Sequence, residues 1–149
     1  MKKPIGEAMT KQPVSIAPDV GLSDALEIMR TWGMRHLPVT NPSGAVEGLI
    51  SERDILRYMA YNPNSKAPVT EAMSRSPYVV TPADSLGTVA QTMAQNKYGC
   101  AIVCGPGGIC GIFTTTDALK ILARILKDPD RNPFLMMKIE DYFRTRAIA

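Results

Sequence analysis

Two short stretches of the sequence place a hydroxyl side chain three residues ahead of a carboxylate. Ser51 precedes Asp54 in the stretch GLISERDIL, and Thr114 precedes Asp117 in the stretch GIFTTTDAL. A hydroxyl and a carboxylate at this spacing can hold a polar ligand. The same pattern before an apolar run is a capping box, which satisfies the backbone N–H groups that begin a helix. Both interpretations stay open, because a capping residue can also contact a ligand.

Both stretches belong to a unit that occurs twice in the chain. A shift of 64 residues places Met9 on Met73, and after two loops whose lengths differ by one residue a shift of 63 places Gly48 on Gly111. Each copy has the pattern of a short strand between prolines, an amphipathic helix, two strands around a turn, and a second helix. The expected elements are residues 13–18, 22–34, 36–40, 45–50 and 51–60 in the first copy, and residues 77–82, 86–98, 100–104, 109–113 and 114–126 in the second.

The repeat predicts an α/β fold of the α+β type, made of two β-α-β-β-α copies and a C-terminal helix. One copy of about 60 residues buries too little apolar surface to be stable alone, so we expect the copies to pack sheet to sheet with pseudo-twofold symmetry. The predicted divisions are repeat 1 at 1–62, a linker at 63–68, repeat 2 at 69–128 and a helical tail at 129–149.

Some side chains outside the two stretches also carry structural predictions. Ser23 or Asp24 is the expected cap of the first helix, and Trp32 is expected to anchor packing rather than to stack on a base. The tail would place four apolar residues on one helical face, which must pack either on this chain's own domain or on a second chain, and we favour a dimer contact. These four residues are Leu135, Ile139, Tyr142 and Phe143.

The composition excludes several classes of protein. Of 149 residues, 45% are hydrophobic and 21% charged, which is typical of a globular chain, and a net charge of +3 without a basic run predicts no nucleic-acid partner. The chain has no apolar run long enough for membrane insertion and no secretory pattern at its start, so a cytoplasmic location is expected. The three cysteines, Cys100, Cys104 and Cys110, and the single histidine fit neither a disulfide framework nor a metal site.

EAM and Gly-h-h-[Ser/Thr]-x-x-Asp (h, hydrophobic) each occur twice between about residues 4 and 126, and MRHLPV lies between them in the first copy. This tandem order resembles a pair of cystathionine-β-synthase (CBS) domains, the Bateman module. The resemblance implies a stand-alone regulatory pair and not an enzyme, with a disc-shaped arrangement, a homodimer of two pairs, and adenosine-containing ligands in the clefts between copies. In such pairs the acid holds the ribose diol and the preceding hydroxyl contacts ribose or phosphate. A carboxylate suits two neighbouring hydroxyls, because it only accepts hydrogen bonds.

Each cleft that the resemblance implies combines the motif of one copy with strands of the other. Cleft A would place Thr114, Thr116 and Asp117 against Val14, Ser15, Ile16, Arg35, His36 and Pro38. Cleft B would place Ser51, Arg53 and Asp54 against Tyr78, Val79, Val80, Gly99 and Cys100. Arg35 and His36 can pair with phosphate, whereas Gly99 and Cys100 cannot, so we expect cleft A to prefer a phosphorylated nucleotide. Cleft B would have Arg53 as its nearby cation.

The regulatory ligand expected from the resemblance is AMP, ADP or ATP, with S-adenosylmethionine or NAD as alternatives and with no catalytic cofactor. The ligand would modulate a partner protein that the sequence does not identify. One competing hypothesis is an interaction scaffold whose clefts are vestigial. Another is a small nucleotide-acting enzyme that uses Asp117 and His36, although the sequence offers it no nucleophile and no orienting partner.

Overall fold

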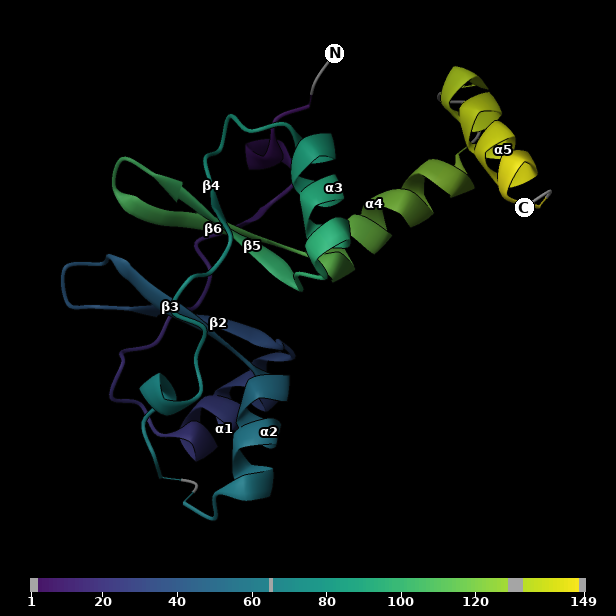
Figure 1. The fold of residues 1–149 in the computed structure, drawn as a ribbon. Helices are drawn as coiled ribbons and strands as arrows, with labels where there is room; N and C mark the ends of the chain where they lie inside the picture. The colour runs from purple at the N-terminus through teal and green to yellow at the C-terminus, as the bar shows by residue number, and fades with distance from the viewer. Residues whose placement is uncertain (1–2, 65, 129–132, 148–149) are drawn as a thin grey trace. The chain divides into compact units, whose positions relative to one another are not determined.

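The computed structural model of the protein describes residues 3–64, 66–128 and 133–147, without the side chains of residues 133–136 and 147. The chain divides into two compact units, residues 1–114 and 115–149. The first unit contains η1 (Ile5–Glu7), β1 (Thr10–Lys11), α1 (Leu22–Trp32), β2 (His36–Thr40), β3 (Val46–Ser51), α2 (Glu52–Tyr61), η2 (Val69–Glu71), β4 (Val79–Val80), α3 (Leu86–Asn96), β5 (Cys100–Gly105) and β6 (Gly108–Thr114) (Figure 1). The second unit contains α4 (Thr115–Lys127) and α5 (Pro133–Ala147).

The predicted helix–hairpin–helix order of the first copy is confirmed. Helices α1 and α2 lie side by side against the antiparallel β2–β3 hairpin (Figure 1). The apolar stripe of α1, formed by Leu22, Leu26 and Met29, is almost completely buried in this copy's core. The helix ends at Gly33, whose φ of 64° lies in the left-handed region that a residue with a side chain adopts reluctantly.

The start of α1 differs from the prediction of a cap at Ser23 or Asp24. The capping residue is Gly21, and both predicted residues lie inside the helix. The Leu22 N–H donates to the Ala67 carbonyl oxygen at 2.9 Å, so a backbone group from further along the chain satisfies one of the first N–H groups.

The second copy contains a four-stranded sheet in the order β1-β6-β5-β4. Strand β5 is antiparallel to β6 and parallel to β4, as a strand–helix–strand connection through α3 requires. In the first copy the strand expected at 13–18 contributes only one bridge, between Ile16 and Val39. Prolines at both ends of this segment, Pro13 and Pro18, lack the N–H that a longer ladder needs.

The opening segment of each copy packs on the other copy. Strand β1 pairs with β6 of the second copy, with Thr10 opposite Ile112. At the repeat-equivalent position, Ser74 bridges Leu49 of β3 in the first copy. The division into repeats at 63–68 stays a prediction, and backbone hydrogen bonds cross it in both directions.

This exchange explains why a methionine and a glycine recur together in the repeat. A Cβ added at Gly111 would lie 2.8 Å from Cγ of Met9, and one added at Gly48 would lie 2.6 Å from Sδ of Met73. Each methionine therefore covers the glycine that begins the Gly-h-h-[Ser/Thr]-x-x-Asp motif of the other copy, and a larger residue in place of either glycine would displace the methionine side chain.

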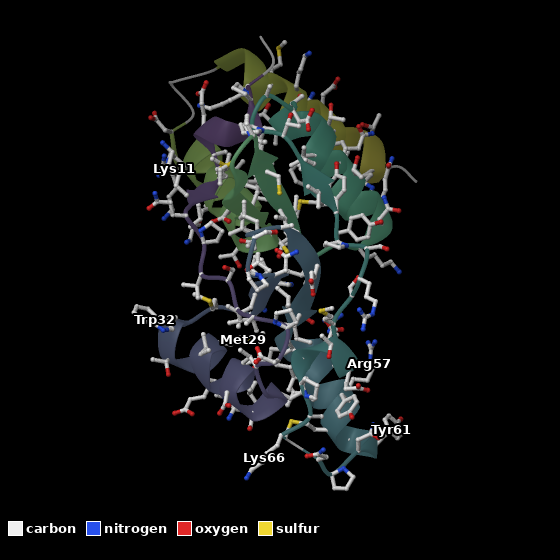
Figure 2. The ribbon with its side chains drawn as sticks, turned by 90° about the vertical axis from the view of Figure 1, so that its left-hand side faces the viewer. Lys11, Met29, Trp32, Arg57, Tyr61 and Lys66 are labelled. Carbon is white, nitrogen blue, oxygen red and sulfur yellow. The ribbon has the colours of Figure 1, made fainter. Side chains whose placement is uncertain are left out.

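Two aromatic side chains at the ends of helices point into solvent. Trp32 is 69% exposed and Tyr61 is 85% exposed, and Figure 2 shows both projecting away from the ribbon, whereas Met29 lies against it. The prediction of Trp32 as a packing anchor is therefore wrong, because the buried stripe of α1 ends at Met29, one turn earlier.

The tail forms the predicted helix, α5, in which Tyr142 and Phe143 contact each other edge to face at 5.7 Å between ring centroids. Both rings are more than half exposed. The sequence also predicts a break in the chain at residues 127–133 (KDPDRNP), of which residues 129–132 lie outside the described residues, as does the side chain of Leu135. A partner for this helix stays a prediction.

Candidate functional site

The first motif forms a complete capping box at the start of α2. The Asp54 N–H donates to Oγ of Ser51 at 3.1 Å, and the Ser51 N–H donates to Oδ2 of Asp54 at 3.0 Å. The Ser51 hydroxyl also donates to Oδ2 at 2.6 Å. These bonds hold a half-buried carboxylate rigidly at a helix N-terminus, where backbone N–H groups favour anions. Both bonds that the carboxylate accepts fall on Oδ2, so the capping box does not use Oδ1.

The second motif spans the junction between the two units. Thr114 is the last residue of β6, and Thr116 and Asp117 lie in the first turn of α4. The sequence predicted that Asp117 faces the strand and loop residues of cleft A. Because those residues belong to the other unit, that arrangement stays a prediction.

Arg35 and His36 lie beside the first motif of their own copy. His36 begins β2 directly opposite Ser51 of β3, and the Glu52 N–H donates to the Arg35 carbonyl oxygen at 3.0 Å. The imidazole is half-buried, and this burial lowers the pKa of His36 below its usual value. Arg35 and Arg53 lower the His36 pKa further, whereas Asp54 raises it.

The side chain of His36 contacts the second copy at Gly99. A Cβ added at Gly99 would lie 2.8 Å from Cε1 of His36 and closer still to Nε2. Glycine at this position therefore leaves the space that the imidazole occupies. The sequence assigned His36 to cleft A and Gly99 to cleft B, but the structure brings the two residues into contact and places His36 within electrostatic range of Asp54 and Arg53.

The other residues predicted for cleft B lie on two neighbouring strands. The Ile102 N–H donates to the Tyr78 carbonyl oxygen at 2.9 Å, which aligns β4 with β5. The Tyr78 ring packs on Tyr98, with ring centroids 5.4 Å apart and planes tilted by 31°. Burial raises the pKa of the Cys100 thiol to about 12, so this thiol stays neutral.

Sequence reasoning missed Tyr98 as a neighbour of the predicted cleft. The signal was present, because a shift of 64 residues places Tyr78 on Val14 and Tyr98 on Met34. The second copy thus has two aromatic residues where the first has two aliphatic ones, and their contact becomes visible only once the strands are aligned.

Two residues predicted for cleft A, Ser15 and Ile16, line an open pocket of about 460 Å³. Thr40 lines the same pocket, and its hydroxyl donates to Oγ of Ser15 at 3.4 Å. Thr40 was missed by sequence reasoning. Strand β2 separates Thr40 from His36 by four residues, about 13 Å in an extended chain, so the pocket lies at the far end of β2 from the imidazole.

The remaining residues predicted for cleft A have unequal exposure. Pro38 is buried, and its carbonyl oxygen accepts the Ile16 N–H at 3.0 Å, whereas Val14 is 41% exposed. Val14 is therefore better placed than Pro38 to present its side chain to a ligand.

Across the described residues, no three His, Cys, Asp or Glu side chains gather closely enough to hold a metal ion. No helix in these parts of the chain is both long and apolar enough to cross a membrane.

The chain matches one protein-family model twice. Residues 5–61 and 69–124 each match the model of the CBS domain. Among curated proteins, it is 27% identical to the uncharacterized protein MJ1225 of Methanocaldococcus jannaschii, over 82% of this chain and 44% of that protein. It is also 27% identical to the CBS domain-containing protein YhcV of Bacillus subtilis, over 76% of this chain and 81% of that protein. The chain thus spans less than half of the first relative and most of the second.

Solved structures share the fold over most of their length. The AcuB protein of Vibrio cholerae superposes with a TM-score of 0.79 at 25% identity, covering 88% of this chain and 98% of that one. The CBS domain pair of protein MJ0100, in complex with 5′-methylthioadenosine and S-adenosyl-L-methionine, has a TM-score of 0.76 at 21% identity, covering 83% and 98%. CBSX2 in complex with AMP has a TM-score of 0.71 at 22% identity, covering 82% and 97%. The fold is that of a CBS domain pair.

Proposed function

The chain belongs to the CBS domain family, and we propose that its two copies form a regulatory module that binds an adenosine-containing ligand in clefts between them. The related pairs solved with AMP, S-adenosylmethionine and 5′-methylthioadenosine support this class of ligand. The three ligands each contain adenosine, so the ribose diol is a common feature that a site for all of them would recognise.

The observation that carries the proposal is the Ser51–Asp54 capping box. It fixes a carboxylate at a helix N-terminus, and both this carboxylate and Arg53 lie in electrostatic range of His36. Asp54 would accept hydrogen bonds from the ribose diol, and the Arg53 guanidinium would pair with phosphate. Such charge-assisted hydrogen bonds contribute about 1.5 to 3 kcal/mol each.

The regulatory part of the proposal concerns a second protein. A ligand shifts a conformational equilibrium only by its different affinities for two states, so the module needs an element with two arrangements. We assign this role to the linker at residues 61–68 or to the tail helix α5. We also propose that the module is a homodimer and that it acts on its partner protein in the cytoplasm. Hydrogen exchange that is unchanged in both segments at ligand saturation would contradict this assignment.

The proposal is tested by a thermal-shift and calorimetry panel of AMP, ADP, ATP, S-adenosylmethionine, 5′-methylthioadenosine and NAD, with GMP as the control for the base. A ligand at 100 times its Kd should stabilise the folded state by about 2.7 kcal/mol. For a chain of this size that corresponds to a rise in Tm of roughly 5 to 10 °C. No shift with any member of the panel would favour an interaction scaffold.

Matched variants then locate the ligand. Asp54→Asn keeps the shape of the side chain but removes its charge, so binding in cleft B should weaken about 10- to 100-fold. Asp24→Asn is the control, because Asp24 also lies in the first turn of a helix but outside the motif. Asp117→Asn tests cleft A in the same way. AMP binding that survives Asp117→Asn but not Asp54→Asn would overturn the expectation that cleft A is the phosphate-preferring site.

A further inference from the structure

The single histidine of the chain lies where the two copies meet. The imidazole of His36 fills the space that Gly99 of the second copy leaves open, and it lies opposite the capping residue Ser51. It thus contacts one residue predicted for cleft B, Gly99, and lies beside another, Ser51 at the start of α2.

Each element around the imidazole contributes differently to its charge. From its own strand and from α2, Arg35 and Arg53 oppose protonation while Asp54 favours it. From the second copy, Gly99 contributes no charge and the buried Cys100 thiol is neutral. Burial and the two arginines therefore outweigh the carboxylate, and the imidazole stays neutral to a lower pH than an exposed histidine would.

Building on the proposed function, we propose that His36 makes the affinity of cleft B for phosphorylated adenosyl ligands, but not for unphosphorylated ones, depend on pH. A phosphate group beside the imidazole adds negative charge at a place where two arginines otherwise disfavour the protonated ring. The imidazolium then pairs with the phosphate, and the protein takes up a proton from solvent as the ligand binds. Adenosine brings no such charge, so its affinity has no matching dependence on pH.

The sign of the effect follows from this linkage. AMP should bind more tightly as pH falls from 8 to 6.5, a range above the second phosphate pKa of about 6, where AMP keeps most of its charge. Each unit by which AMP raises the His36 pKa corresponds to about a tenfold difference in affinity between the two ends of its titration.

The test is a direct NMR titration of the imidazole. Because the chain contains one histidine, protein without added histidines gives a single pair of imidazole proton signals to follow. The titration is recorded for the free protein and at saturation with AMP and with adenosine. The expected result is a His36 pKa that rises with AMP and not with adenosine, together with an AMP affinity that changes with pH in the wild type and is flat in His36→Gln.

The remaining outcomes would overturn the inference. If AMP binds and leaves the His36 pKa unchanged, the inference fails while the proposed function stands. If AMP still raises the pKa in Asp54→Asn but not in Asp117→Asn, His36 serves cleft A and the assignment to cleft B fails. If no adenosyl ligand binds, the proposed function fails and this inference fails with it. The wild-type titration alone shows whether AMP changes the His36 pKa, so the inference can be tested even if His36→Gln does not fold.

Discussion

Replacing Gly99 with alanine tests whether the contact between His36 and the second copy exists as described. The backbone at Gly99 needs no left-handed conformation, so the new Cβ is the relevant change. That atom would lie 2.8 Å from Cε1 of His36, whereas carbon atoms in good contact are about 3.5 to 4.0 Å apart. The imidazole or the strand must therefore move by about 1 Å.

Two opposing effects set the size of the change. Overpacking of this kind costs about 1 to 3 kcal/mol. Gly-to-Ala replacement also restricts the unfolded chain, which stabilises by about 0.4 to 1 kcal/mol. The first effect is larger, so Gly99→Ala should destabilise the protein by about 1 to 2 kcal/mol. That loss corresponds to a Tm lower by roughly 2 to 8 °C.

The assay is urea unfolding of a double-mutant cycle. In a His36→Ala background no imidazole stands in the way of the new Cβ. Gly99→Ala should then leave the free energy of unfolding unchanged or raise it by up to about 1 kcal/mol. The difference between backgrounds then measures the coupling between the two residues. Gly107→Ala is the matched control, because no atom lies within 4 Å of its added Cβ. A Gly99→Ala protein as stable as the wild type in both backgrounds would refute the contact.

Three further changes test other features. Ser51→Ala removes the capping box of α2 and should cost about 0.5 to 2 kcal/mol in the free energy of unfolding; no loss would mean that the box does not stabilise the helix. Gly87 is exposed inside α3, and a Cβ added there would lie no closer than 3.9 Å to another atom, Oγ of Ser85. Gly87→Ala should therefore raise the free energy of unfolding by about 0.5 to 1 kcal/mol, and a decrease would show that the space around the new Cβ is not open. The pKa of His36 is lower in the folded than in the unfolded protein, so the unfolded chain binds more protons and stability should fall as pH drops below about 6.5. Urea unfolding at pH 8 and 5.5 should show a smaller fall in His36→Gln than in the wild type.

Local structure was largely predictable from the sequence, because each element depends on residues within a few positions of one another. The spacing of Leu22, Leu26 and Met29 identified α1, and the Ser51–Asp54 pair identified the cap of α2. The error at the start of α1 has the same origin. Ser23 is a good capping residue by type, yet the Ala67 carbonyl, 45 positions from Leu22 in the chain, decides where the helix begins.

Pairing between the two copies was not predictable in the same way. In a tandem repeat each strand has two partners of nearly equal suitability, one in its own copy and one in the other. Thr10 could have been placed beside Leu49 or beside Ile112, and the chain adopts the second. The contact of His36 with Gly99 is hidden for the same reason, because the missing side chain of a glycine leaves no pattern in the sequence that points to its neighbour.

The exchange of opening segments gives the two copies a shared stability. Strand β1 completes the sheet of the second copy and brings Met9 onto Gly111, while Met73, from the start of the second copy, covers Gly48 of the first. Neither copy can open this packing without exposing a strand edge and apolar surface in the other. The contact of His36 with Gly99 spans the same boundary. Packing at this seam therefore couples the stability of one copy to that of the other.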